Sequence, residues 1–266
     1  MTLLYIVLAT GIGGVLSVAI AAALTVSMLR VVVRHLVSLS AGVLLGTALL
    51  NLLPEAFEVH AGVAHADPKS LFVTLLAGLM FFFLLEKAEL YRHGHHHEGD
   101  DPHHHHHHGF DREQAGRGGF SVLVGDSIHN FCDGIIIAAA FLADAKLGAV
   151  TAMAIIAHEI PQEVGDYMVL LNAGLTRKRA LAYNAISGLA AVVGGIVGYL
   201  VVGPWESLLP YLLVIASSSF IYVAVADLIP QLQRRLALRD TVIQIAWLAC
   251  GLTLIWLIVG PLHGGH

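Results

Sequence analysis

Charged side chains are scarce in this chain of 266 residues. Lysine, arginine, aspartate and glutamate make up 12% of it, whereas 57% of its residues are hydrophobic. Soluble domains carry about twice that charged fraction. The composition therefore excludes an ordinary water-soluble domain and predicts an integral membrane protein surrounded by a lipid bilayer. The net charge of −5 gives no reason to expect a nucleic-acid partner.

Cysteine is nearly absent. Cys132 and Cys250 are the only two, and they lie far apart in apolar sequence. Cysteines in such surroundings are typical of small buried hydrophobic side chains rather than of a disulfide framework. The position of Cys132 beside a polar segment leaves a soft metal ligand as an alternative.

Hydrophilic stretches are missing too, with one exception at residues 92–118. Apolar runs of about 20 residues are long enough to cross a bilayer as helices. We therefore expect one all-α membrane domain over residues 1–266, with eight spans and a single long loop. The spans are predicted at 3–29, 36–57, 69–91, 119–143, 147–173, 180–202, 207–232 and 241–262.

The basic residues predict the orientation of these spans. Of the 14 lysines and arginines, all but Lys69 and Lys146 fall in connections on one side of the expected bundle. Basic residues accumulate in cytoplasmic connections. We therefore expect a cytoplasmic loop at 92–118 and both termini outside the cytoplasm.

Two polar clusters interrupt the apolar fourth and fifth spans. The first runs Asp126-Ser127-Ile128-His129-Asn130-Phe131-Cys132-Asp133, and the second runs His158-Glu159-Ile160-Pro161-Gln162-Glu163-Val164-Gly165-Asp166. Both lie near the centres of their spans, and helical phase places most of the polar side chains of each on one stripe. One charged residue at the bilayer centre costs about 2.5–3.5 kcal/mol on the insertion scale. A bound ion explains five such carboxylates better than a structural polar seam between helices does.

The ligand types indicate which ion. His129, His158 and Asp133, with Gln162, form a nitrogen and oxygen set that suits zinc or a similar divalent metal. Asn130, Glu159 and Glu163 are expected to form an adjoining site richer in oxygen. Zinc is the expected cargo, and the same ligands admit Fe²⁺, Mn²⁺, Co²⁺ and Cd²⁺.

Pro161 adds a separate prediction. Because proline has no N–H, the carbonyl of Ala157 loses its helical hydrogen-bond partner. A free carbonyl inside the membrane needs water, a side chain or an ion.

At these residues the chain resembles the ZIP (Zrt-/Irt-like) family of divalent metal transporters, in particular the subfamily with a histidine-rich cytosolic loop. The run from His129 to Gly134 matches the pattern HNxxDG, and the run from His158 to Asp166 matches HEIPHEVGD except at Gln162. The resemblance implies metal movement toward the cytoplasm by a sliding, elevator-like motion, no enzymatic activity, and often a homodimer. It carries the family's ligands over to His129, Asn130, Asp133, His158, Glu159 and Gln162. A bacterial cytoplasmic membrane is the expected location.

Two departures from the family pattern weaken a two-metal centre. Gln162 stands where the subfamily has histidine, so a neutral amide replaces a stronger ligand. In the sixth span, some relatives have glutamate after a Ser-Gly-Leu-x run, whereas here Ser187-Gly188-Leu189-Ala190 is followed by Ala191. We therefore expect one good site with a weakened neighbour.

The loop at 92–118 carries a run of six histidines, His103 to His108, with four more before it. Because it lies between two spans, it is interpreted as a native metal-capturing tract rather than a purification tag.

A faint internal repeat also occurs. The second span ends Asn51-Leu52-Leu53-Pro54 and the seventh ends Asp227-Leu228-Ile229-Pro230, in spans that run in opposite directions. This pattern predicts an inverted repeat of spans 1–3 and 6–8 around spans 4 and 5.

Two other functions remain as alternatives at this stage. An exporter of the cation-diffusion type also uses HxxxD, which His129 and Asp133 satisfy, but such proteins resemble a six-helix pore with a cytoplasmic domain. An intramembrane metalloprotease needs HExxH, and Gln162 replaces its second histidine. Energy coupling stays open among a channel, proton coupling and metal-driven alternation.

Overall fold

The computed structural model describes residues 1–23, 26–58, 67–94, 112–172, 174–204, 206–233 and 237–263. Within these ranges every regular element is a helix, as the composition predicts. The elements are α1 (Thr2–Ala23), α2 (Val26–Thr47), η1 (Ala48–Leu52), α3 (Leu53–Phe57), α4 (Pro68–Gly94), α5 (Arg112–Ala143), α6 (Ala145–Asn172), α7 (Arg177–Val202), η2 (Glu206–Leu208), α8 (Leu209–Tyr222), η3 (Val223–Leu228), α9 (Ile229–Gln233) and α10 (Leu238–His263). Residues 95–111, which hold most of the predicted histidine tract, lie outside the described residues.

Seven helical stretches in the described ranges are long and apolar enough to cross a membrane. They correspond to all the predicted spans except the fifth. That span is present as α6, a continuous helix of 28 residues. Because α6 carries several imidazole, amide and carboxylate side chains, the mean hydropathy of a segment of α6 long enough to cross a membrane is lower than that of the other long helices. The all-helical prediction is confirmed for the described residues, which contain seven helices long and apolar enough to cross a membrane, or eight if α6 is included.

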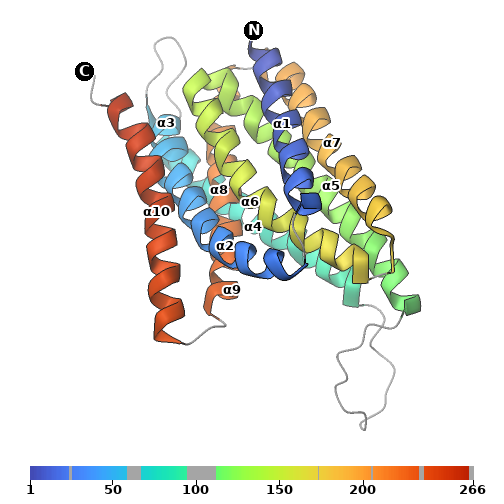
Figure 1. The fold of residues 1–266 in the computed structure, drawn as a ribbon. Coiled ribbons are helices and arrows are strands. Elements are labelled where there is room, and N and C mark those ends of the chain that lie inside the picture. Colours follow the sequence, from blue (N-terminus) through green and yellow to red (C-terminus); the bar gives the residue numbers. More distant parts are fainter. Residues whose placement is uncertain are drawn as a thin grey trace.

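The long helices form two packed groups (Figure 1). Helices α1, α5, α6 and α7 contact one another, and α2, α4, α8 and α10 form the second group, in which α2 packs on α10 and α4 on α8. The contact between α2 and α6 is the most extensive one across the boundary. The first residue of α1 and the last turn of α10 lie at one end of the bundle, and α5 begins at the other (Figure 1).

Backbone contact fixes α5 against α7. A Cβ atom at Gly134 would overlap the carbonyl oxygen of Ala191, and one at Gly194 would overlap that of Phe131. Only glycine allows two helices to approach this closely, which is how helices associate where lipid removes the hydrophobic driving force. The α5–α7 pair therefore forms a rigid support for any side chains that α5 presents.

The predicted repeat coincides with two matching irregularities. In η1, the N–H of Leu53 donates to the carbonyl of Ala48, and in η3, the N–H of Ile229 donates to that of Ala224. Both bonds span five residues instead of four, and each donor immediately precedes a proline. The two spans thus share a wide turn in the same register, which four matching residues alone did not reveal.

Candidate metal centre

The short connection between α5 and α6 sets the positions of the polar clusters. The carboxylate Oδ1 of Asp144 accepts hydrogen bonds from the backbone N–H groups of Lys146 at 2.8 Å and Leu147 at 3.1 Å, which caps the N-terminus of α6. The two helices therefore run antiparallel from a tight turn. Residues at similar distances from Asp144 lie at the same depth, so the polar stripe of α5 meets that of α6.

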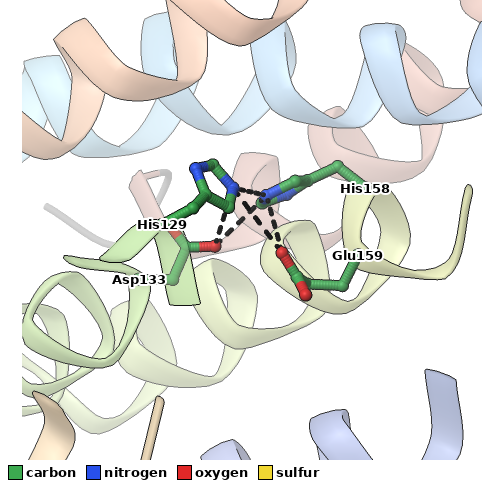
Figure 2. Close-up of side chains that lie close together, drawn as sticks. All are labelled: His129, Asp133, His158 and Glu159. Atoms are coloured by element: carbon green, nitrogen blue, oxygen red, sulfur yellow. Dashed lines mark hydrogen bonds and ion pairs between the residues drawn. The ribbon is translucent and has the colours of Figure 1, made fainter. Parts of the chain in front are cut away.

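Four side chains converge where the stripes meet (Figure 2), and we call them the principal centre: His129 and Asp133 from α5, and His158 and Glu159 from α6. The two imidazole Nε2 atoms lie 3.2 Å apart. Asp133 Oδ2 lies 3.2 Å from His158 Nε2 and 3.7 Å from His129 Nε2. Glu159 Oε1 lies 3.5 Å from His158 Nε2 and 3.6 Å from His129 Nε2.

These separations fit a single divalent ion. Nitrogen and oxygen ligands about 2.0–2.1 Å from a tetrahedral zinc ion lie about 3.3 Å from one another. The five measured distances, 3.2 to 3.7 Å, scatter around that value. Two imidazoles and two carboxylates supply the ligand number and type that zinc prefers.

Burial makes the centre costly without a cation. The exposed fraction is 1% for Asp133, 2% for His158 and 6% for Glu159. Neither carboxylate oxygen of Asp133 receives a hydrogen bond of good geometry, and neither does Glu159 Oε1. A buried carboxylate without donors is strongly unfavourable, and an ion among these oxygens removes that penalty. The side chain of His129 is 21% exposed, so it is the most accessible of the four.

One histidine is oriented for metal binding by its own helix. The Nδ1 atom of His158 lies 3.2 Å from the carbonyl oxygen of Ala154. Because a carbonyl only accepts, Nδ1 is the donor in this contact, which leaves Nε2 facing the other side chains of the centre. This arrangement is common among metal-bound histidines. The ring of Phe220 from α8 lies edge-on to that of His158 and closes the apolar side.

The Ala157 carbonyl, which has no helical N–H donor because of Pro161, accepts a hydrogen bond from a different helix. The hydroxyl of Ser40, on α2, donates to the carbonyl oxygen of Ala157. This bond crosses the boundary between the two helix groups. The sequence indicated that Ala157 needed a partner, but it could not identify Ser40, because the two residues are 117 positions apart.

The two amides expected among the ligands are turned toward a different residue. Asn130 Nδ2 and Gln162 Nε2 each donate to Oδ1 of Asp126 at 3.1 Å. Asp126 shares the polar face of α5, but its role was missed. The sequence could have indicated the contact with Asn130, because Asp126 and Asn130 are four residues apart on one helix. It could not have indicated the contact with Gln162, which depends on how α5 and α6 pack.

A second group of carboxylates adjoins the principal centre and shares Glu159 with it. Asp126, Glu159 and Glu163, which we call the carboxylate cluster, each place one oxygen within 4.8 Å of the others. Of the seven predicted ligands, His129, Asp133, His158 and Glu159 are therefore together, Glu163 lies in the neighbouring cluster, and Asn130 and Gln162 bond to Asp126.

The known proteins that this chain is similar to are described as zinc transporters. The family model described as "ZIP Zinc transporter" matches residues 1–109 and 87–259. The chain is 40% identical to mouse "Zinc transporter ZIP10" over 152 residues, 55% of this chain and 18% of that protein. It is 43% identical to rat "Zinc transporter ZIP4" over 111 residues, 42% of this chain and 17% of the relative. It is 39% identical to human "Zinc transporter ZIP6" over 111 residues, 42% of this chain and 15% of the relative.

The aligned regions thus cover less than a fifth of the length of each of these relatives. The family is one of metal transporters rather than enzymes, and its match does not favour the exporter or the metalloprotease alternative. The match covers most of the residues and includes both polar motifs. This chain belongs to the ZIP zinc transporter family.

Proposed function

We propose that this chain carries divalent transition-metal ions, with zinc as the main substrate, across a membrane through the principal centre. The observation that carries the proposal is the convergence, inside apolar helices, of two imidazole nitrogens and two carboxylates that have buried oxygens without a hydrogen bond of good geometry. Oxygen and imidazole ligands exchange faster than a thiolate cage would, as a transport site requires. Fe²⁺, Mn²⁺, Co²⁺ and Cd²⁺ are secondary candidates because the same ligands accept them.

The proposed direction is into the cytoplasm. Helix α7 begins with three basic residues, Arg177, Lys178 and Arg179, and the segment before α10 also carries arginines. By the positive-inside rule these connections are cytoplasmic, which puts both termini outside. The histidine-rich loop at 92–118 would then receive ions on the cytoplasmic side.

The proposed mechanism is an elevator-type alternating access. The principal centre lies entirely on α5 and α6, which belong to one helix group, and α5 is held against α7 by close backbone contact. The second group meets this unit mainly through α2 and α6, where Ser40 binds the Ala157 carbonyl. Sliding of one group along the other would move the site while keeping its ligands together.

The matching wide turns of η1 and η3 support an inverted repeat of spans 1–3 and 6–8 around α5 and α6. They lie in the second and seventh of the eight proposed spans, which an inverted repeat of this kind relates to each other.

We further propose a homodimer in the cytoplasmic membrane of a bacterium; the relatives compared are animal proteins. Cross-linking in native membranes tests the dimer.

Zinc uptake into proteoliposomes that contain the purified chain tests the transport proposal. His158→Ala and Asp133→Ala should each reduce the initial rate of radioactive zinc uptake more than about tenfold, because removing even an outer-shell partner of a metal commonly costs 10–100-fold. His35→Ala, on α2 and in ring contact with Trp247, is the matched control and should transport normally. Normal uptake by both site variants would show that the centre is assigned wrongly.

A further inference from the structure

His158 is the more enclosed of the two histidines in the principal centre. It is 2% exposed, and its Nδ1 atom lies 3.2 Å from the carbonyl oxygen of Ala154. A hydrogen bond at the nitrogen that does not face the ion helps to orient an imidazole, but the ring can still pivot about that one contact. The direction of its Nε2 atom therefore also depends on the side chains that lie against the ring.

Two aromatic rings flank the imidazole of His158. The ring of His129 lies 5.5 Å away between centroids, at an interplanar angle of 85°. The ring of Phe220 lies 6.3 Å away at an angle of 64°. Both are edge-to-face arrangements of the kind that aromatic pairs prefer. Because a phenylalanine ring offers no ligand atom, what Phe220 contributes to the centre is a limit on how far His158 can turn.

Phe220 is itself firmly packed. It is 1% exposed and is among the largest fully buried side chains of the described residues. It belongs to the main hydrophobic core, together with Ile137 of α5 and Ile155 of α6. Protein interiors are packed as densely as organic crystals, so this ring cannot move aside unless its neighbours move as well.

The helix that carries Phe220 is held to α4. The hydroxyl of Ser218 shares its proton between the carbonyl oxygens of Val214, in its own helix, and Leu75, on α4, at 2.8 and 3.1 Å. A Cβ atom at Gly78 of α4 would overlap the side chain of Ser218. The ring of Phe220, two residues beyond Ser218, therefore reaches the principal centre from the second helix group.

From these contacts we propose that Phe220 is a positioning residue for the principal centre. Its ring keeps the imidazole of His158 turned so that Nε2 faces Asp133 Oδ2 at 3.2 Å and Glu159 Oε1 at 3.5 Å. Phe220 thereby strengthens zinc binding without touching the ion. The proposal rests on the proposed function, because that function assigns the four side chains as the metal site.

Binding of Co²⁺ and zinc to the purified full chain tests the proposal, since the visible absorption bands of Co²⁺ report the geometry of its ligands. Phe220→Leu keeps an apolar side chain and removes the ring. It should change the Co²⁺ bands and weaken zinc binding about two- to tenfold, the size expected for the loss of one aromatic pair. Phe220→Ala, which also leaves a cavity, should weaken zinc binding further.

Two comparisons isolate the effect. Each protein is measured beside the same protein with His158→Ala added, and the difference removes the signal of the histidine-rich loop. The matched control is Phe82→Leu, the same change at a buried residue of the same helix group, whose ring contact is with Phe81. This control should bind both ions as the wild type does.

Two results would overturn the positioning role. One is a Phe220→Leu protein that elutes as folded protein in gel filtration and binds both ions like the wild type. The other is a loss of thermal stability with unchanged Co²⁺ bands and zinc affinity, which a purely structural residue would show. If His158→Ala itself leaves Co²⁺ and zinc binding unchanged, the principal centre is assigned wrongly, and the proposed function fails together with the role of Phe220.

Discussion

Two aspartates on α5, two helical turns apart, are buried in similar surroundings but partnered differently. Asp126 is 5% exposed and accepts two amide N–H groups at 3.1 Å. Asp133 is 1% exposed, and neither of its oxygens receives a hydrogen bond of good geometry. Hydrogen bonds offset much of the cost of burying a carboxylate. The comparison shows that hydrogen-bond partners, rather than residue type or burial, distinguish a carboxylate that is free to bind an ion from one that is already held in place.

The strongest test of this contrast removes only the charge of Asp133. Asp133→Asn keeps the shape of the side chain, and it should weaken zinc binding at the principal centre by more than about 100-fold, since losing even an outer-shell partner costs 10–100-fold. Asp126→Asn should change zinc binding there by no more than about fivefold, because Asp126 is not among its four ligands. Competition with a fluorescent chelator measures both. If Asp133→Asn and Asp126→Asn lost the same amount of zinc affinity, the two aspartates would not differ in their roles at the principal centre.

Gln162→Ala tests the partnered side of the comparison. The variant removes one of two donors from Asp126, a hydrogen bond to a charged group that contributes about 1.5–3 kcal/mol. Thermal stability in detergent should fall accordingly, while zinc binding at the principal centre should stay within a few-fold of wild type. A loss of zinc affinity as large as that of Asp133→Asn would instead make Gln162 a ligand, as the family resemblance implied.

Ser40→Ala extends the comparison to the backbone. Without the hydroxyl, the Ala157 carbonyl beside Pro161 loses its donor, at a cost of about 1–2 kcal/mol. Because the bond joins the two helix groups, we also expect a changed rate of zinc uptake with unchanged zinc affinity. Ser40→Thr keeps the hydroxyl and serves as the control. An altered affinity in Ser40→Ala would mean that α2 shapes the centre itself.

The smallest effect is expected at the exposed end of the same helices. Asp144→Ala removes the cap from α6 and should lower stability by about 0.5–1 kcal/mol, with no change in metal binding. Asp144→Asn, which also caps well, should be nearly neutral. A change in zinc affinity in either variant would show that the turn controls how α5 and α6 align.

Much of this architecture follows from local sequence, because apolar length and helical phase act within one segment. They predicted the helices and the facing stripes that bring His129 and His158 together. Features that depend on packing between segments were not predictable: Ser40 lies far from Ala157 in sequence, and an amide such as Gln162 can either bind metal or donate to a carboxylate. The choice is made by the position of Asp126 on the neighbouring helix. The assignment of the seven ligands stays a prediction until an ion is bound.

The wide turns at η1 and η3 have a consequence for how this chain tolerates changes in length. Each turn contains one residue more than a regular helix would need at that point. Deleting Leu50 would remove the extra residue of η1, so that the helix before the turn and α3 after it keep their relative orientation, while Pro54 still leaves one carbonyl without a helical N–H donor. A single-residue deletion, which is usually destructive inside a buried helix, would here regularise the backbone. The buried side chains of the turn, Ala48, Asn51 and Leu52, are the ones that would have to repack.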